Sequence, residues 1–331
     1  MVAAHAGVSP MSVSNVLNGQ PTSVAMRAAV HAAIEELGYV PNLAARQLAS
    51  AAPTIIGLLH ANDEHPVSAA LLNGALTAAT RLGVQLLLEP IVFPELASGW
   101  EKVAALRRRG AAAILLPPTF GEMMASAGGR EEFECPVICV GAADEVPTLS
   151  TVRIDEFAAA QEVTEGLIAR GHRRIGFLRL PAKFPAHAPR WHGYLAAMRR
   201  HGVTVEPELI AEGEFWFQEG LAAGGRLLDL PDPPTAIFAS NDEMATGVLA
   251  AAQIRRVAVP KELSVVGFED TYFAQNVWPP LTSVKIPMSA MSSTAVERLL
   301  REIRSVAKPS PSGPTSVVVP HTINWRASTG D

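Results

Sequence analysis

The chain contains very little cysteine. Cys135 and Cys139 are the only two cysteines among 331 residues. Two thiols cannot build a disulfide framework, so the composition argues against a disulfide-stapled secreted fold and favours the cytoplasm. The N-terminus also lacks a basic segment that leads into an apolar stretch with a cleavage site, so we expect no signal peptide.

Long hydrophobic runs are missing as well. The longest runs, 54–61 and 111–118, stop well short of the about 18 residues that a membrane-spanning helix needs, so we expect no membrane partner. Hydrophobic residues still make up 48% of the chain and charged residues 18%, which allows a large core and excludes global disorder. At about 150 residues per domain, the length corresponds to roughly two domains.

Positive charge is scarce. The formal net charge is −5, which argues against a polyanionic partner for the chain as a whole. Residues 1–50 contain no lysine, and Arg27 and Arg46 are balanced by Glu35 and Glu36. DNA affinity depends on neutralised phosphates, with a salt slope of about −0.9 per contact. If this segment binds DNA, we expect either a missing basic segment upstream or weak binding with a shallow salt dependence.

Motifs of metal sites and of common catalytic sites are also missing from the sequence. The nine histidines include no His-x-x-x-His pair and no Cys/His cluster, so we expect no metal ion and no cofactor. No Gly-x-Gly-x-x-Gly follows a predicted strand, and neither a Gly-x-x-x-x-Gly-Lys-Ser/Thr loop nor a Gly-x-Ser-x-Gly elbow is present. The sequence therefore argues against an enzyme.

Beyond residue 53, short apolar stretches alternate with amphipathic ones, which predicts a parallel α/β structure. The predicted strands are 54–60, 84–89, 112–116, 137–141, 174–180, 235–239 and 263–268, with a last strand near 316–324. The predicted helices are 67–82, 97–110, 156–170, 190–201, 217–229, 241–254 and 288–304.

The first fifty residues predict three helices instead. Ser9 is a good N-cap, and Pro10 follows at the first helical position, where its missing N–H costs nothing. The second helix runs to about Leu17, and the third runs from near Ser23 to Leu37. Two short helices joined by a tight glycine turn, with a third packed on them, form a helix-turn-helix. A small helical cap on an enzyme is the alternative interpretation.

The residues of this module follow a long gapped pattern. They read Val2-Ala3-x-x-Ala6-Gly7-Val8-Ser9-x-x-Ser12-Val13-Ser14-x-Val16-Leu17-Asn18, then Leu37-Gly38-Tyr39-Val40-Pro41-Asn42 and Ala44-Ala45-Arg46-Gln47-Leu48-Ala49. The pattern resembles the lactose/galactose repressor (LacI/GalR) family of bacterial transcription regulators. The resemblance implies a helix-turn-helix domain over 1–40, a hinge helix and linker over 41–53, and a chain that starts later than is usual in the family, through a mis-assigned start codon or a true truncation.

The resemblance also implies which residues contact DNA. Leu48 matches the hinge leucine that wedges into the minor groove, where an apolar side chain unstacks a base step and kinks the duplex; a buried helix position is the alternative. Asn15 stands where the family commonly has arginine. Asparagine can pair with adenine where arginine would read guanine, so we expect a base preference that can differ from that of the family. The other expected DNA contacts are Ser9, Pro10, Met11, Ser12, Ser14, Asn18, Asn42 and Arg46.

The resemblance continues through 54–331. It rests on Gly171-His172-Arg173-Arg174-Ile175, Arg190-x-x-Gly193-Tyr194, Thr235-Ala236-Ile237-Phe238-Ala239-x-Asn241-Asp242 and Leu263-Ser264-Val265-Val266-Gly267-Phe268-Glu269-Asp270. It implies an effector-binding and dimerisation core with the fold of periplasmic sugar-binding proteins. That fold has two Rossmann-like lobes, three crossovers and a ligand cleft between the lobes.

Ligands of open parallel sheets bind beyond the carboxyl ends of the strands. By the family match, Arg190, Asn241 and Glu269 contact the effector and Phe215 stacks on it. A carboxylate can accept two hydroxyls, and a guanidinium can fork onto a hydroxyl pair or a carboxylate. The expected effector is a sugar or a sugar acid, and an unusual ligand is the alternative. Two further expected contacts are His65 and Asp155, although Asp155 can also simply cap the helix that follows it.

These observations favour an effector-responsive repressor that binds double-stranded, pseudo-palindromic operator DNA as a homodimer. An effector in the cleft would rotate the lobes, and this rotation would determine whether the hinge helices are ordered. The alternative is a solute-binding protein, or a sensor that lacks strong DNA binding because of its shortened N-terminus.

Overall fold

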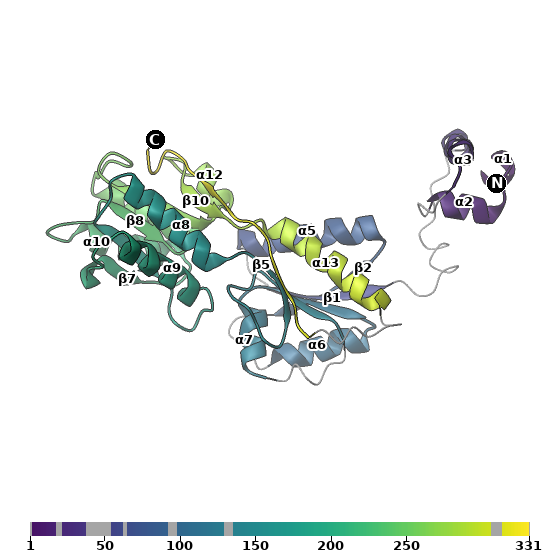
Figure 1. Cartoon of the computed structure of the whole chain (residues 1–331), viewed down its shortest axis with the longest axis horizontal. Coiled ribbons are helices and arrows are strands. Elements are labelled where there is room, and N and C mark those ends of the chain that lie inside the picture. Colours follow the sequence, from purple (N-terminus) through teal and green to yellow (C-terminus); the bar gives the residue numbers. More distant parts are fainter. Residues whose placement is uncertain are drawn as a thin grey trace. The chain divides into compact units, whose positions relative to one another are not determined.

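The computed structural model describes residues 2–17, 22–37, 54–61, 65–91, 98–128, 135–305 and 313–330. Contacts divide the chain into two compact units, Met1–Pro53 and Thr54–Asp331, both of which are drawn in Figure 1. Among the described residues, no helix combines the length and the apolar character needed to cross a membrane.

The N-terminal unit is a three-helix module. Its helices are α1 (Val2–His5), α2 (Pro10–Leu17) and α3 (Val24–Glu36). They enclose a small apolar core formed by Val2, Val13, Val16, Val30 and Ala33. The Ser9 hydroxyl accepts a hydrogen bond from the Ser12 amide at 3.1 Å, and the Ser23 hydroxyl accepts one from the Met26 amide at 3.2 Å. Side-chain oxygens thus satisfy amides that a helix start leaves without partners, and the predicted helix-turn-helix is confirmed.

The first lobe of the C-terminal unit is a three-layer α/β structure. Its sheet has the strand order β11-β5-β4-β3-β1-β2, and all neighbouring strands are parallel. The strands are β1 (Ile55–Ala61), β2 (Gln85–Ile91), β3 (Ala113–Leu116), β4 (Val137–Val140), β5 (Ser150–Arg153) and β11 (Ser316–Val318). Helices α5 (Pro66–Leu82) and α13 (Met288–Ser305) cover one face, and α6 (Gly99–Arg108) and α7 (Phe120–Ser126) cover the other (Figure 1).

The second lobe repeats this arrangement. Its strand order is β12-β10-β9-β8-β6-β7, and only the pairing of β12 with β10 is antiparallel. The strands are β6 (Ile175–Arg179), β7 (Ile210–Glu212), β8 (Ala236–Ala239), β9 (Ser264–Glu269), β10 (Thr282–Lys285) and β12 (Thr322–Asn324). Helices α8 (Glu156–Ala169) and α9 (His187–Arg200) pack on one face, and α10 (Phe217–Leu228) and α11 (Asp242–Ile254) on the other, while the short α12 (Tyr272–Asn276) follows β9. Strands covered on both faces must be apolar throughout, which explains their continuous hydrophobic runs.

The chain passes between the lobes three times. The crossings lie between β5 and α8, between β10 and α13, and between β11 and β12. The last crossing corrects one sequence-based expectation, because the single strand predicted near 316–324 is divided into one edge strand for each sheet. The predicted fold class, a helix-turn-helix domain followed by a two-lobed α/β core, is confirmed.

Candidate functional site: a cavity between the lobes and a helix-turn-helix

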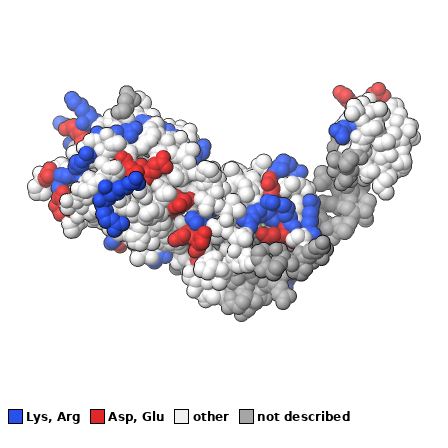
Figure 2. Space-filling model, in the orientation of Figure 1, with Lys and Arg blue, Asp and Glu red and all other residues white. Residues whose placement is uncertain are grey.

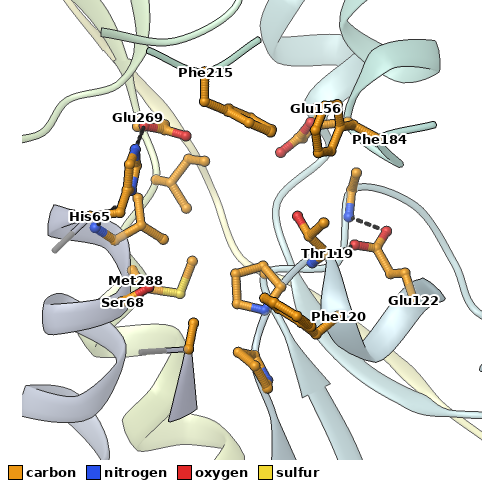
Figure 3. Close-up of a pocket in the computed structure, with 18 of the residues that line it drawn as sticks. His65, Ser68, Thr119, Phe120, Glu122, Glu156, Phe184, Phe215, Glu269 and Met288 are labelled. Atoms are coloured by element: carbon orange, nitrogen blue, oxygen red, sulfur yellow. Dashed lines mark hydrogen bonds and ion pairs between the residues drawn. The ribbon is translucent and has the colours of Figure 1, made fainter. Parts of the chain in front are cut away.

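A cavity of about 380 Å³ lies between the two lobes of the C-terminal unit, beyond the carboxyl ends of the parallel strands. Most of its wall is apolar and is formed by Ala61, Val67, Ile91, Pro117, Pro118, Phe120, Ala143, Phe184, Ala186, Phe215, Trp216, Ile286 and Met288. Its polar side chains are those of His65, Ser68, Thr119, Glu122, Glu156, Arg190, Glu214 and Glu269. Figure 3 shows that the labelled residues surround a common space. A concave, mostly apolar pocket with a few convergent polar groups is typical of a small-molecule site.

Glu269 provides the most unusual polar group of the cavity. It is the last residue of β9, whose residues are all buried, and its backbone φ is 105°, followed by 53° at Asp270. A φ of 105° is rare outside glycine, and residues with strained backbone cluster at functional sites, whereas aspartate adopts the left-handed region more readily. The Asp270 carboxylate stabilises this turn. It accepts a hydrogen bond from Asn324 at 2.7 Å and forms an ion pair with Arg326 at 2.6 Å.

The Glu269 carboxyl is 8% exposed, and its Oε2 has no hydrogen-bond partner in the described part of the chain. The nearest cationic or titratable nitrogen to that oxygen is His65 Nε2, at 3.6 Å. Burial, which disfavours the charged form, raises the pKa of Glu269 to about 8, and this effect exceeds the opposing attraction of Arg190. A ligand that enters the cavity therefore meets a carboxyl oxygen ready to form a hydrogen bond.

His65 is placed by the start of α5. Its Nδ1 accepts a hydrogen bond from the Val67 amide at 3.4 Å, which makes it the N-cap of that helix. A ring nitrogen that accepts must be unprotonated, so Nε2 carries the hydrogen and directs it toward Glu269 (Figure 3). Both lobes therefore contribute to this pair.

Arg190 is bound by the protein itself. Its Nε and NH2 groups donate to the two Glu156 carboxylate oxygens at 2.8 and 2.7 Å, and a third N–H donates to the Ser240 carbonyl. The guanidinium also lies over the Phe268 ring at 4.1 Å from its centroid. Both members of the ion pair are buried, with side chains 4% exposed. Arg190 lines the cavity as predicted, but its fork is already filled by a carboxylate, a partner that the sequence analysis missed.

Asn241 and Asp155 are the two predicted effector contacts that do not line the cavity. Asn241 is fully buried, where its Oδ1 caps α11 through the Met244 amide and its Nδ2 donates to the Phe215 carbonyl at 2.9 Å. Asp155 caps α8 through the Ala158 amide at 2.9 Å. Their polar atoms satisfy the backbone, so in this structure both support the site from behind its wall.

Aromatic rings form one end of the cavity. The rings of Phe184 and Phe215 meet edge to face, with centroids 4.7 Å apart. Phe120 and the half-exposed Trp216 also line the cavity. The sequence analysis predicted Phe215 alone; Phe184 follows β6 in a loop that carried no recognisable pattern.

Glu122 is a further buried carboxyl that the sequence analysis missed. It is 7% exposed and accepts hydrogen bonds from the amides of Thr119 at 3.1 Å and Ala143 at 2.8 Å. Burial raises its pKa to about 7. The short spacing Thr119-x-x-Glu122 is a capping box, which was the available signal in the sequence. Among the described residues, no cluster of three or more His, Cys, Asp or Glu side chains is placed to hold a metal ion.

The predicted DNA-reading face lies on α2 of the N-terminal unit. Met11 is 70% exposed, while Val13 and Val16 face the core. Ser9, Pro10, Ser12 and Asn15 lie at the surface or partly exposed in this helix and its cap. The side chain of Ser14, and the whole of Asn18, Asn42, Arg46 and Leu48, lie outside the described residues. Figure 2 shows few charged side chains on the visible face of this unit, in agreement with its composition.

Comparison with known proteins places both units. The family model described as bacterial regulatory proteins, lacI family, matches residues 2–42, and the model of a periplasmic binding protein-like domain matches residues 164–329. Catabolite control protein A of Priestia megaterium is 32% identical over 99% of this chain and 98% of its own length. The chain belongs to the LacI family of bacterial regulatory proteins.

Other LacI-family relatives support this assignment. The HTH-type transcriptional repressor CytR of Escherichia coli K12 is 40% identical over 47% of this chain and 46% of its own length. A structure of a transcriptional regulator CelR–cellobiose complex has a TM-score of 0.70 at 29% identity and covers 99% of this chain and 98% of that one. The Lac repressor dimer bound to operator and the anti-inducer ONPF has a TM-score of 0.76 at 25% identity, over 100% and 98% of the two chains. These relatives are transcription regulators, and effector-controlled DNA binding is typical of the family.

Proposed function

We propose that this LacI-family protein is a repressor whose affinity for operator DNA is controlled by a small effector in the cavity between its lobes. The observation that carries the proposal is the Glu269 carboxyl, buried in a cavity of about 380 Å³ with one oxygen lacking a hydrogen-bond partner in the described chain. A buried polar atom without a hydrogen bond costs folding free energy. Such an atom is expected in a binding site whose ligand supplies the missing hydrogen bond. The same chain carries a helix-turn-helix that can read a major groove.

The partners follow by analogy with the relatives. The Lac repressor structure is a dimer on operator DNA, so we infer a homodimer that places two α2 helices on a pseudo-palindromic operator. The CelR structure holds cellobiose, so the carbohydrate class, a sugar or a sugar acid, is the first to screen. The relatives are regulators rather than enzymes, and we extend this role, and a place in the cytoplasm beside the DNA, to this chain.

The test is an anisotropy titration of promoter DNA from beside the encoding gene with the full chain, as printed and in a version extended upstream. We expect salt-sensitive binding that a small molecule from a metabolite panel changes by at least tenfold. Ligand binding should also raise the melting temperature, because a ligand that binds only the folded state stabilises it. Absence of DNA binding by both versions, with a ligand-induced melting shift retained, would instead support the sensor alternative, for which the zero net charge of residues 1–50 is the favouring observation.

A further inference from the structure

We propose that the effector presents a protonated amine to Glu269 and an apolar ring or chain to the aromatic end of the cavity, so that amine-bearing ligands are preferred over neutral and acidic ones. The inference rests on the proposed function, because it takes the cavity between the lobes as the effector site.

The first step concerns the cations around the cavity. Arg190 is held by both oxygens of Glu156, at 2.8 and 2.7 Å, and cannot offer an uncompensated charge to a ligand. Lys183 does not line the cavity, and it pairs at 2.6 Å with Glu214, which does. The Nδ1 atom of His65 accepts a hydrogen bond from the Val67 amide, and its Nε2 lies 3.6 Å from Glu269 Oε2. Each cationic side chain described at this site is thus already matched with a carboxylate.

The second step concerns the carboxyls that remain. Glu269 and Glu122 line the cavity, and neither forms an ion pair with a described lysine or arginine. Glu122 accepts two backbone N–H groups, and Glu269 Oε2 accepts no hydrogen bond from the described residues and lies 3.6 Å from His65 Nε2. Asp242 lies behind Glu269 and receives hydrogen bonds from Thr271 and Ser283. If these carboxyls ionise, no lysine or arginine is left to balance their charge. An acidic ligand would therefore meet them with no available positive charge, whereas an ammonium group would compensate their ionised form.

The third step concerns the apolar wall. The Phe184 and Phe215 rings lie 4.7 Å apart by their centroids, and in Figure 3 Phe215 and Glu269 lie at the same end of the cavity. Aromatic faces attract cations, and they stack on flat or apolar groups. A polyhydroxylated ligand would leave many hydroxyls against a wall that offers few hydrogen-bond partners. An amine attached to an apolar or ring body matches both the carboxyl and the rings.

The protonation of Glu269 supplies a distinctive signature. Burial, with the neighbouring Glu156 and Glu243, favours the protonated form of this carboxyl in the empty site, while Arg190 opposes them. An ammonium ion that binds beside it makes the carboxylate form favourable. The carboxyl proton then passes to the buffer, the amine keeps its own proton, and the complex contains one ion pair. Binding of an amine should release close to one proton at pH 7, whereas binding of a neutral sugar should release none.

The experiment uses the full chain and matched sets of compounds that differ in charge. One set is D-glucosamine, D-glucose and D-glucuronate; others are benzylamine, benzyl alcohol and benzoate, and cyclohexylamine, cyclohexanol and cyclohexanecarboxylate. Isothermal titration calorimetry at pH 7, in two buffers with different ionisation enthalpies, measures affinity and proton release together. We expect at least one amine to bind tenfold or more tightly than both of its counterparts, with proton release.

The variant Glu269→Gln should lose that preference at least tenfold, while Glu208→Gln, an exposed acid of the same lobe that does not line the cavity, should keep it. A cooperative thermal transition shows that each variant folds. The proposal is overturned if the preference for the amine is below tenfold in every set, or if nothing binds. Tighter binding of an acid also overturns it.

Operator anisotropy is recorded on the same samples. If DNA binding responds to a neutral or acidic compound, the amine proposal fails and the repressor function stands. If no DNA is bound, the repressor function fails separately.

Discussion

At the residue scale, the site consists of buried acids whose environments differ. Both oxygens of Glu156 accept hydrogen bonds from Arg190, and Glu122 accepts hydrogen bonds from backbone amides. Glu269 has an oxygen without a hydrogen-bond partner in the described chain. The sequence placed His65, Arg190, Phe215 and Glu269 at the cavity because each aligned with a strand end or a family motif. It could not place Glu156, because the pairing of two side chains from different helices depends on how α8 packs on α9.

The buried acids predict an unusual dependence of stability on pH. Burial raises the pKa of Glu122 and Asp242 to about 7 and that of Glu269 to about 8, from ordinary values near 4. The folded state therefore binds protons more tightly than the unfolded state. Their contribution to stability is complete below about pH 4 and is lost as the pH rises toward 8.

We expect the free energy of unfolding of the ligand-free protein to fall by on the order of a few kcal/mol between pH 5 and 8.5, because one unit of pKa difference corresponds to about 1.4 kcal/mol. Urea denaturation at a series of pH values measures this fall. Glu269→Gln should reduce the fall and make the protein more stable than the wild type at pH 8.5. If the free energy of unfolding of the wild type rises over this pH interval, the raised pKa values of these three carboxyls are contradicted.

The Arg190–Glu156 pair gives a second prediction at this scale. Glu156→Gln leaves a buried guanidinium, 4% exposed, without its carboxylate, and such a loss costs about 3–5 kcal/mol. Chemical denaturation of the two proteins measures the difference. The matched control is Glu212→Gln, because Glu212 pairs with Arg179 at 3.0 Å but both side chains are at least 35% exposed; there the expected cost is under about 1 kcal/mol. If both variants lose the same free energy of unfolding, burial does not increase the cost of removing the carboxylate.

At the scale of elements, long and strongly patterned segments were predicted well. The structure places α5 at Pro66–Leu82 and α8 at Glu156–Ala169, within one residue of the predicted ranges 67–82 and 156–170 at both ends. The strands β5, β7 and β10 were missed, since they have three or four residues each and include polar side chains. Such short strands are specified by their neighbours in the sheet more than by their own composition. The helices α7 and α12 were also missed, because helices of seven and five residues are too short to show a clear apolar period.

Close helix packing in the second lobe depends on glycine. An added Cβ at Gly220 of α10 would lie 2.1 Å from the Met244 carbonyl oxygen of α11, a backbone atom that cannot move aside easily. We expect Gly220→Ala to lower the free energy of unfolding by about 1–3 kcal/mol or more through overpacking. Thermal and urea denaturation check this value. Ala222→Ser, on the exposed face of the same helix, should stay within about 0.5 kcal/mol of the wild type, and a similar effect of both changes would refute the packing argument.

At the scale of the whole molecule, the two units carry different charge. Residues 1–50 sum to zero, so the net −5 belongs to the rest of the chain. The three helices of the N-terminal unit were predicted from caps and apolar spacing, both of which are local. The DNA contact of Leu48 stays a prediction, since that residue lies outside the described range.

This charge balance predicts a shallow salt dependence of operator binding. A dimer that uses Arg27 and Arg46 of both subunits neutralises about four phosphates, so the slope of log affinity against log salt should be no steeper than about −4. Anisotropy titrations at several salt concentrations give the slope.

Leu48→Ala should weaken operator binding without changing effector affinity, because the wedge is expected to contact only DNA. A steeper slope for the printed chain, or an equal loss of both affinities in Leu48→Ala, would contradict these expectations.

The edge strands β11 and β12 have a consequence for how the protein is made. One short stretch, residues 316–324, supplies β11 to the first sheet and β12 to the second. During synthesis, neither sheet can be completed until this stretch has left the ribosome, even though domains generally fold as units in N-to-C order. Until then β5 and β10 are open sheet edges, which invite pairing with other chains. Both lobes should therefore reach protease resistance together, and only after residues 316–324 have left the ribosome.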